Sequence, residues 1–91
     1  MEINLGDVSL TIVRKGRALD GYGSEKVIGM EITIPDDLPM DKQERARIWI
    51  HALLESVSVS HLLYGWKHDD IEIVESPLAI ALVALGWDPP D

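Results

Sequence analysis

The sequence predicts an α+β domain: a small antiparallel sheet of about three strands packed on a long central helix, with a second helix near the C-terminus. Apolar and polar residues alternate over 3–12 and over 28–34, which predicts strands, and a nearly continuous helical pattern covers 46–64. A chain of 91 residues can bury one core but not two. We therefore expect a single domain spanning residues 1–91.

The first alternating segment has the pattern of a β-hairpin with its turn at Gly6-Asp7. A two-residue turn at this point places four apolar side chains on one face, pairing Leu5 with Val8 and Ile3 with Leu10. The second segment, residues 28–34, predicts one further strand. Pro35 ends it, because proline cannot donate a hydrogen bond to a sheet.

The strongest helix pattern covers residues 46–64. Asp41 and Glu44 precede it with the spacing of a capping box, with aspartate in the cap position, and Gly65 supplies a stop. The helix is apolar over most of its circumference. We therefore expect it to be largely buried and to form the central support of the domain.

The region after the long helix contains a short apolar segment and a second helix pattern. Ile71–Val74 is too short to distinguish a strand from a helix. Ser76-Pro77 has the pattern of a cap followed by a first-turn proline. It predicts a helix that begins there and ends near Leu85, because Gly86 follows.

The composition restricts the partners that the chain can have. Asp and Glu number 16 against 8 Lys and Arg, and the net charge of −8 should repel phosphate backbones. We expect no direct nucleic-acid binding; a basic protein partner suits this charge, and solubility alone is the simpler explanation of it. Cysteine is absent, and the longest apolar run is about half of what spans a bilayer, so we expect a cytoplasmic protein without membrane contact.

A narrow polar stripe runs along the long helix between its apolar sides. It contains Glu44, Arg47, His51, Glu55 and Ser58. His51 and Glu55 lie one turn apart, so both can reach the same metal ion. An ordinary solvent-exposed face is the simpler explanation of the stripe, with weak side-chain pairs worth about 0.2–0.5 kcal/mol each.

The same stripe contains an altered zinc-peptidase motif. In an H-E-x-x-H helix, two histidines four residues apart bind the ion, and the glutamate after the first activates water. The corresponding positions here are His51, Ala52 and Glu55. An alanine methyl group cannot accept a proton from metal-bound water, so we expect no catalytic residues and a peptidase activity that is absent or incidental. His61 and His68, farther along the chain, are possible substitute ligands, but an ordinary, partly exposed histidine is the simpler explanation of each.

Several sequence segments, taken in their order along the chain, carry a resemblance to a known family. They are Gly21-Tyr22-Gly23, Glu31 to Pro39, Gln43-Glu44-Arg45, Ile50 to Glu55, Leu78 to Leu82 and Trp87 to Asp91. Together they resemble the small zincin-like metallopeptidase domains of phages and prophages, which are related to the ImmA/IrrE and SprT-like groups. The resemblance covers residues 2–91 and implies a hairpin, a strand, a metal-bearing helix and a closing helix.

The resemblance also implies a set of metal ligands. His51 matches the first zinc ligand of the family, and Glu55 stands in place of its second histidine. A third ligand, a carboxylate from the following segment, corresponds to Glu75 or Glu72. His51, Glu55 and Glu75 with water would hold zinc weakly and with poor selectivity, so no tightly bound cofactor is expected.

These features favour a non-catalytic zincin-like phage or prophage protein that binds a protein partner, for example as an inhibitor of a basic host defence or DNA-handling factor. A phage-encoded chain would act in the host cytoplasm. Two alternatives stay open. One is a metal-dependent peptidase or hydrolase with an altered His/Glu site; the other is a structural or self-associating protein that uses the long helix and Leu62. Among the three tryptophans, Trp66 is the best candidate for exposure.

Overall fold

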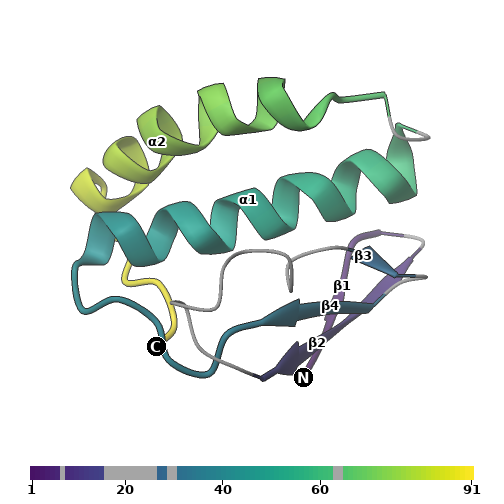
Figure 1. Ribbon diagram of the computed structural model, residues 1–91, viewed down its shortest axis with the longest axis horizontal. Coiled ribbons are helices and arrows are strands. Elements are labelled where there is room, and N and C mark those ends of the chain that lie inside the picture. Colours follow the sequence, from purple (N-terminus) through teal and green to yellow (C-terminus); the bar gives the residue numbers. More distant parts are fainter. Residues whose placement is uncertain (7, 16–26, 29–30, 63–64) are drawn as a thin grey trace.

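The computed structural model describes residues 1–6, 8–15, 27–28, 31–62 and 65–91. The elements in chain order are β1 (Glu2–Asn4), β2 (Ser9–Arg14), β3 (Val27–Ile28), β4 (Glu31–Ile34), α1 (Lys42–His61) and α2 (His68–Ala84). They form three layers, with the sheet on one side of α1 and α2 on the other (Figure 1). The α+β class and the packing of the sheet on a long central helix are therefore confirmed.

The N-terminal hairpin has the predicted register. β1 and β2 are antiparallel, with Ile3 opposite Leu10, and the amide of Leu5 donates to the carbonyl of Val8 at 2.7 Å. Gly6 has φ +89°, a left-handed conformation that glycine adopts without steric penalty. Asp7, the second residue of the predicted turn, lies outside the described residues.

The sheet is mixed, so the prediction of an antiparallel sheet is wrong for one pair of strands. The strand order is β1-β2-β4-β3, and β2 runs parallel to β4, with Ile12 beside Ile32. The strand predicted over 28–34 is divided between β3 and β4, which pair antiparallel with Ile28 opposite Glu31. Alternation reveals that a strand exists and which face is buried, but it carries no information about strand direction.

Two apolar clusters lie on opposite sides of α1. The cluster toward the sheet contains Leu10, Ile12, Ile32, Ile34, Trp49 and Ala52. The cluster toward α2 contains Ala46, Ile50 and Ala79, with Leu54, Leu82, Val83 and Trp87 packed against it. This two-sided burial explains why the helix is apolar over most of its circumference.

The predicted cap of α1 is confirmed. The carboxylate of Asp41 accepts a hydrogen bond from the amide of Glu44 at 2.9 Å, which satisfies one of the free amides of the first turn. At the other end the helix closes at Leu62, whose carbonyl accepts from the amide of Gly65 at 2.8 Å.

The second helix begins nine residues earlier than predicted, because its cap is Lys67 instead of Ser76, and Pro77 lies in its interior. The undecided segment Ile71–Val74 is helical. Pro77 removes the hydrogen bond to the carbonyl of Ile73, and both residues are exposed, so water can solvate that carbonyl. Sequence reasoning placed the helix start at this proline because proline is most common in a first turn.

The end of α2 has the predicted glycine stop. Gly86 has φ +100° and donates to the carbonyl of Val83 at 3.0 Å, and Trp87 donates to the carbonyl of Leu82 at 2.9 Å. These two bonds define a Schellman motif. The chain then reverses and runs beside the start of α1.

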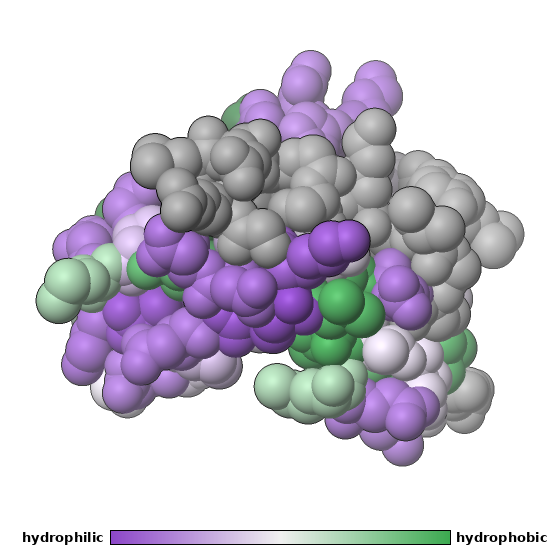
Figure 2. Space-filling model, turned by 60° about the horizontal axis from the view of Figure 1, so that its bottom comes forward, coloured by the Kyte–Doolittle hydropathy of each residue, from purple (hydrophilic) through white to green (hydrophobic). Residues whose placement is uncertain are grey.

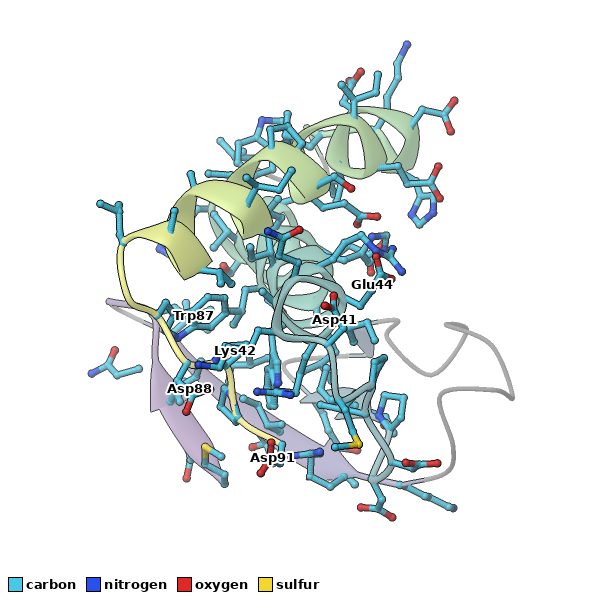
Figure 3. The ribbon with its side chains drawn as sticks, turned by 90° about the vertical axis from the view of Figure 1, so that its left-hand side faces the viewer. Asp41, Lys42, Glu44, Trp87, Asp88 and Asp91 are labelled. Carbon is cyan, nitrogen blue, oxygen red and sulfur yellow. The ribbon has the colours of Figure 1, made fainter. Side chains whose placement is uncertain are left out.

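The C-terminal segment lies beside the start of α1, with Asp88 close to Lys42 (Figure 3). One buried arginine of α1 holds it there. The guanidinium of Arg45, which is 6% exposed, donates to the carbonyls of Pro89 (2.9 Å), Pro39 (3.2 Å) and Met40 (3.0 Å). It also pairs with the carboxylate of Asp88 at 3.2 Å. Beside it, the indole of Trp49 donates to the carbonyl of Pro90 at 2.8 Å.

Replacing Arg45 with Ala should lower the free energy of unfolding by about 2–4 kcal/mol, because it leaves several carbonyls without donors and removes the ion pair between this buried guanidinium and the exposed carboxylate of Asp88. Urea unfolding followed by tryptophan fluorescence measures this change. Lys42→Ala is the matched control, since Lys42 is exposed and lies 3.9 Å from the same Asp88; it should change stability by less than about 0.5 kcal/mol. Equal midpoints for the two variants would contradict the anchoring role of Arg45.

Candidate metal centre

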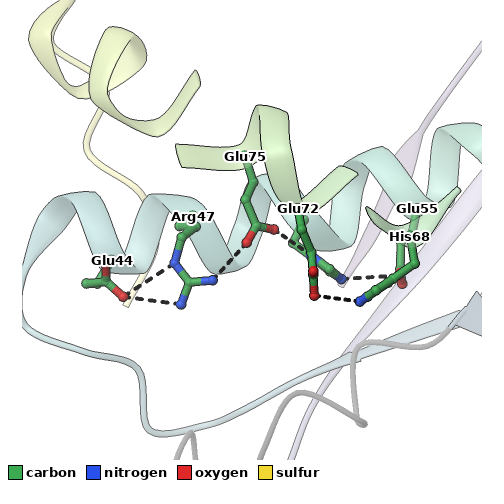
Figure 4. A network of polar contacts seen from close by, with 7 residues as sticks. Glu44, Arg47, Glu55, His68, Glu72 and Glu75 are labelled. Atoms are coloured by element: carbon green, nitrogen blue, oxygen red, sulfur yellow. Dashed lines mark hydrogen bonds and ion pairs between the residues drawn. The ribbon is translucent and has the colours of Figure 1, made fainter. Parts of the chain in front are cut away.

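A cluster of histidines and glutamates lies where the polar stripe of α1 meets the first turns of α2 (Figure 4). His51 and Glu55 are one turn apart on α1, and His68 and Glu72 are one turn apart on α2. Each helix thus presents a histidine and a carboxylate toward the other. The predicted solvent-exposed stripe is therefore partly an interface between the two helices.

All four ring nitrogens of His51 and His68 lie within hydrogen-bond distance of a carboxylate. His51 Nδ1 is 2.5 Å from Glu75 Oε2, and His51 Nε2 is 3.1 Å from Glu55 Oε1. His68 Nδ1 is 2.9 Å from the same Glu55 oxygen, and His68 Nε2 is 2.9 Å from Glu72 Oε1. The two rings pack edge to face, with centroids 4.8 Å apart.

This arrangement requires positive charge beyond that of two neutral histidines. A neutral imidazole has one N–H, and an ionised carboxylate only accepts, so each neutral histidine can satisfy one of its two carboxylate contacts. Each remaining contact needs a further proton, on the ring or on the carboxyl group, or a cation between the nitrogen and the carboxylate oxygen. Two protons and one divalent metal ion bring the same charge.

Glu75 holds His51 from the side of the ring opposite Glu55. Its carboxylate is 5% exposed and accepts from His51 and from Arg47 Nη1 at 2.9 Å, while Arg47 also pairs with Glu44 at 3.2 Å. A carboxylate on Nδ1 fixes the ring orientation and directs Nε2 toward a ligand site. The resemblance implied Glu75 as the third metal ligand. In the structure Glu75 contacts Nδ1 of His51, on the side of the ring away from Glu55.

The ligand atoms that come together are those of His51, Glu55 and His68, which all lie within 4.8 Å of one another. Zinc binds nitrogen and oxygen at about 2.0–2.2 Å in a tetrahedron, which places its ligand atoms roughly 3.3–3.6 Å apart. Small side-chain movements bring the three atoms to that spacing. Two imidazoles and one carboxylate form a ligand set that zinc sites commonly use, so these residues fit the ion that the resemblance implies.

Sequence reasoning considered His68 only as a less favoured substitute ligand, although one signal pointed to it. The spacing His-x-x-x-Glu occurs twice, at 51–55 and at 68–72. The side chain of His68 is 57% exposed, as expected, but it also takes part in the cluster. His61, in contrast, is exposed and its Nδ1 lies 2.6 Å from the hydroxyl of Ser60.

The position of the missing general base is buried. Ala52 is 1% exposed and belongs to the apolar cluster between α1 and the sheet. Its methyl group offers no proton acceptor to the cluster, as the sequence indicated. Trp66 is 42% exposed, whereas Trp49 is buried, which confirms the prediction about the tryptophans.

No protein-family model, curated protein or solved structure matches this chain. Within the described residues, neither helix combines the length and apolarity needed to cross a membrane.

In the metal-free protein, the pKa of His68 should lie above 6.5. The main cause is the hydrogen bond to Glu55, which stabilises the charged ring; burial opposes this effect, and Glu72 adds to it. The charged form therefore stabilises the fold below about pH 6.5, and this contribution is lost as the pH rises through the pKa of the folded state. NMR titration of the ring protons with a chelator present measures the pKa. Glu55→Gln should lower it more than Glu72→Gln, and the reverse order would contradict the geometry.

Proposed function

We propose that this chain is a non-catalytic zincin-like protein of phage or prophage type that binds a divalent transition-metal ion between α1 and α2 and acts by binding a protein partner. His51, Glu55 and His68 would hold the ion, with Glu75 and Arg47 supporting His51 from behind. Zinc suits this ligand set best, because it accepts imidazole and carboxylate in tetrahedral sites.

The observation that carries the metal proposal is that every ring nitrogen of His51 and His68 faces a carboxylate. With two neutral histidines and ionised carboxylates, hydrogen bonding satisfies only two of these four contacts. A divalent ion at the group formed by His51, Glu55 and His68 supplies the same charge at neutral pH. Metal binding should accordingly displace protons from the cluster.

The ligands come from both helices, so the ion would join α2 to α1. His51 and Glu55 belong to α1 and His68 opens α2, after the connection at residues 62–67. An ion that binds only the folded form raises the free energy of unfolding by RT ln(1 + [L]/Kd), about 2.7 kcal/mol at a hundredfold excess over Kd. The metal would thus have a structural role.

Absence of catalysis is supported by Ala52. A bound metal ion lowers the pKa of a coordinated water and polarises carbonyls, but a proton acceptor must then stand beside that water. Ala52 offers none, and Glu55 is one of the proposed ligands. A metal-dependent hydrolase remains the second candidate because Glu72, whose side chain is 54% exposed, brings one more carboxylate to His68.

The choice of a protein partner rests on charge and on the altered motif. A chain of net charge −8 attracts basic surfaces at long range and repels nucleic acid. This charge favours a basic host factor as the partner, which the chain would inhibit by binding to it. The step from a lost catalytic base to a recognition function is an analogy with other degenerate enzymes.

Zinc should raise the melting temperature of the chelator-treated protein and bind with one-to-one stoichiometry in calorimetry. His51→Ala and His68→Ala should each abolish the shift, because each removes one of three ligands. His61→Ala should retain it, since His61 lies on α1 outside the cluster. A zinc-induced shift that survives both cluster variants, or no shift in the wild type, would refute the metal site.

The zinc-loaded protein should show no hydrolysis of unstructured peptides above the zinc-only background, because Ala52 cannot accept a proton. Fluorogenic peptide libraries at several pH values measure the turnover. Activity that disappears in both His51→Ala and Glu72→Gln would favour the hydrolase instead. Such a result would leave the metal site intact and remove only the non-catalytic part of the proposal.

A further inference from the structure

α2 is the outer layer of the domain, and its side away from α1 carries large apolar side chains in solvent. Five of them are exposed over 39–83% of their area: Ile73 (71%), Val74 (41%), Leu78 (39%), Ile80 (53%) and Leu85 (83%). We call these five residues the α2 outer face. The buried residues Ile71, Glu75 and Ala79 lie on the other side of the helix. Such a concentration of exposed apolar residues marks an interaction site.

The sheet side of the molecule differs from this face. With the sheet side turned forward, hydrophilic residues cover most of the described surface and apolar residues form smaller groups (Figure 2). The long helix, which the sequence offered as a self-association surface, is buried between two layers. Leu62 at its end is 41% exposed, but it stands apart from the α2 outer face.

The charge pattern of the α2 outer face indicates what covers it. Between Ile73 and Gly86 the only charged residue is Glu75, and it is buried. Exposed acidic residues of α2 are confined to its first turns, at Asp69, Asp70 and Glu72. A basic partner would find complementary charge at one end only, whereas a second uncharged apolar face complements this one along its length.

We propose that the α2 outer face is a homodimer interface in which the α2 helices of two copies pack antiparallel about a two-fold axis near Pro77. Parallel packing would bring the acidic first turns of the two copies together. Antiparallel packing separates the two Asp70 side chains by about 20 Å along the helix, at 1.5 Å per residue. That separation exceeds two Debye lengths of roughly 8 Å at physiological salt, so their repulsion is screened.

This symmetry pairs two of the three most exposed residues of the face. Ile73 and Ile80 are seven residues apart and therefore lie on one side of the helix. The two-fold axis exchanges them, so that Ile73 of each copy packs on Ile80 of the other. Leu85 of each copy then lies over a hollow of about 220 Å³ in the other, lined by Trp66, Asp70, Ile71 and Val74.

Sedimentation and light scattering of the full chain over a range of concentrations test the proposal. The wild type should become dimeric. Ile73→Glu and Ile80→Lys should each raise the dimer dissociation constant at least about tenfold, since each places two charges in the interface. Both residues are exposed, so the variants should keep the wild-type circular dichroism spectrum, and also the wild-type melting temperature at concentrations low enough for the wild type to be monomeric. Met40→Glu is the matched control, because Met40 is 95% exposed and lies outside α2.

A charge-swap experiment tests the register. An equimolar mixture of the Ile73→Glu and Ile80→Lys variants should form a heterodimer, because one contact becomes a Glu–Lys pair and the other stays wild type. Added salt should strengthen the wild-type dimer, since each copy carries −8, whereas it would weaken association with a basic partner. A chain that stays monomeric at about 0.5 mM would overturn the proposal. So would a dimer insensitive to both variants, or a mixture that does not associate.

Discussion

The whole structure depends on the burial of α1 from two sides. The sheet covers one side and α2 covers the other, so the facing edge of α2 supplies partners to the polar stripe of α1. A buried or half-buried polar group without a partner is strongly destabilising. His51, 6% exposed on this stripe, therefore requires Glu75 from α2, and Glu75 in turn requires Arg47. The position of α2 and the composition of the cluster follow from this requirement.

The cluster has more negative than positive charge when its histidines are neutral. Among the described residues, four carboxylates, those of Glu44, Glu55, Glu72 and Glu75, share one guanidinium and two imidazoles. Two additional protons or one divalent ion would bring the net charge of these seven groups to one negative unit. Protons and a metal ion would therefore compete for the same cluster, and the pH would decide which of them binds. In the metal-free protein, the hydrogen bond to Glu55 raises the pKa of His68, burial opposes this, and Glu72 adds to the increase.

The sequence predicted the elements whose signals are local. The hairpin register follows from the alternation around Gly6, and the start of α1 follows from the spacing of Asp41 and Glu44. The direction of β4 was not predictable in this way, because a parallel and an antiparallel neighbour bury the same side chains. The start of α2 was misplaced since Pro77 is tolerated inside the helix by exposure, a property of the tertiary structure that no local pattern records.

The candidate site shows the same division between local and tertiary information. His51 and Glu55 lie one turn apart on a single helix, so their proximity was readable from spacing. His68 and Glu75 both come from α2, and their positions depend on where that helix begins. A helix starting at Ser76 would have left His68 in a loop, whereas the helix that starts at His68 brings its first residue beside Glu55. The error in the helix boundary therefore concealed the proximity of His68 to Glu55, while the ligand set of His51, Glu55 and Glu75 stays a prediction.

The two halves of α2 are held to α1 by different forces. Its second half contributes Ala79, Leu82 and Val83 to the apolar cluster with α1, while its first half is held by Ile71 and the polar cluster. Pro77 interrupts the helical hydrogen bonding between these halves. An ion at His51, Glu55 and His68 would stabilise the half that the apolar cluster does not. Ile73 and Val74 project from this same half, so a metal ion and a second copy of the chain would order the same turns from opposite faces, and binding of either would favour binding of the other.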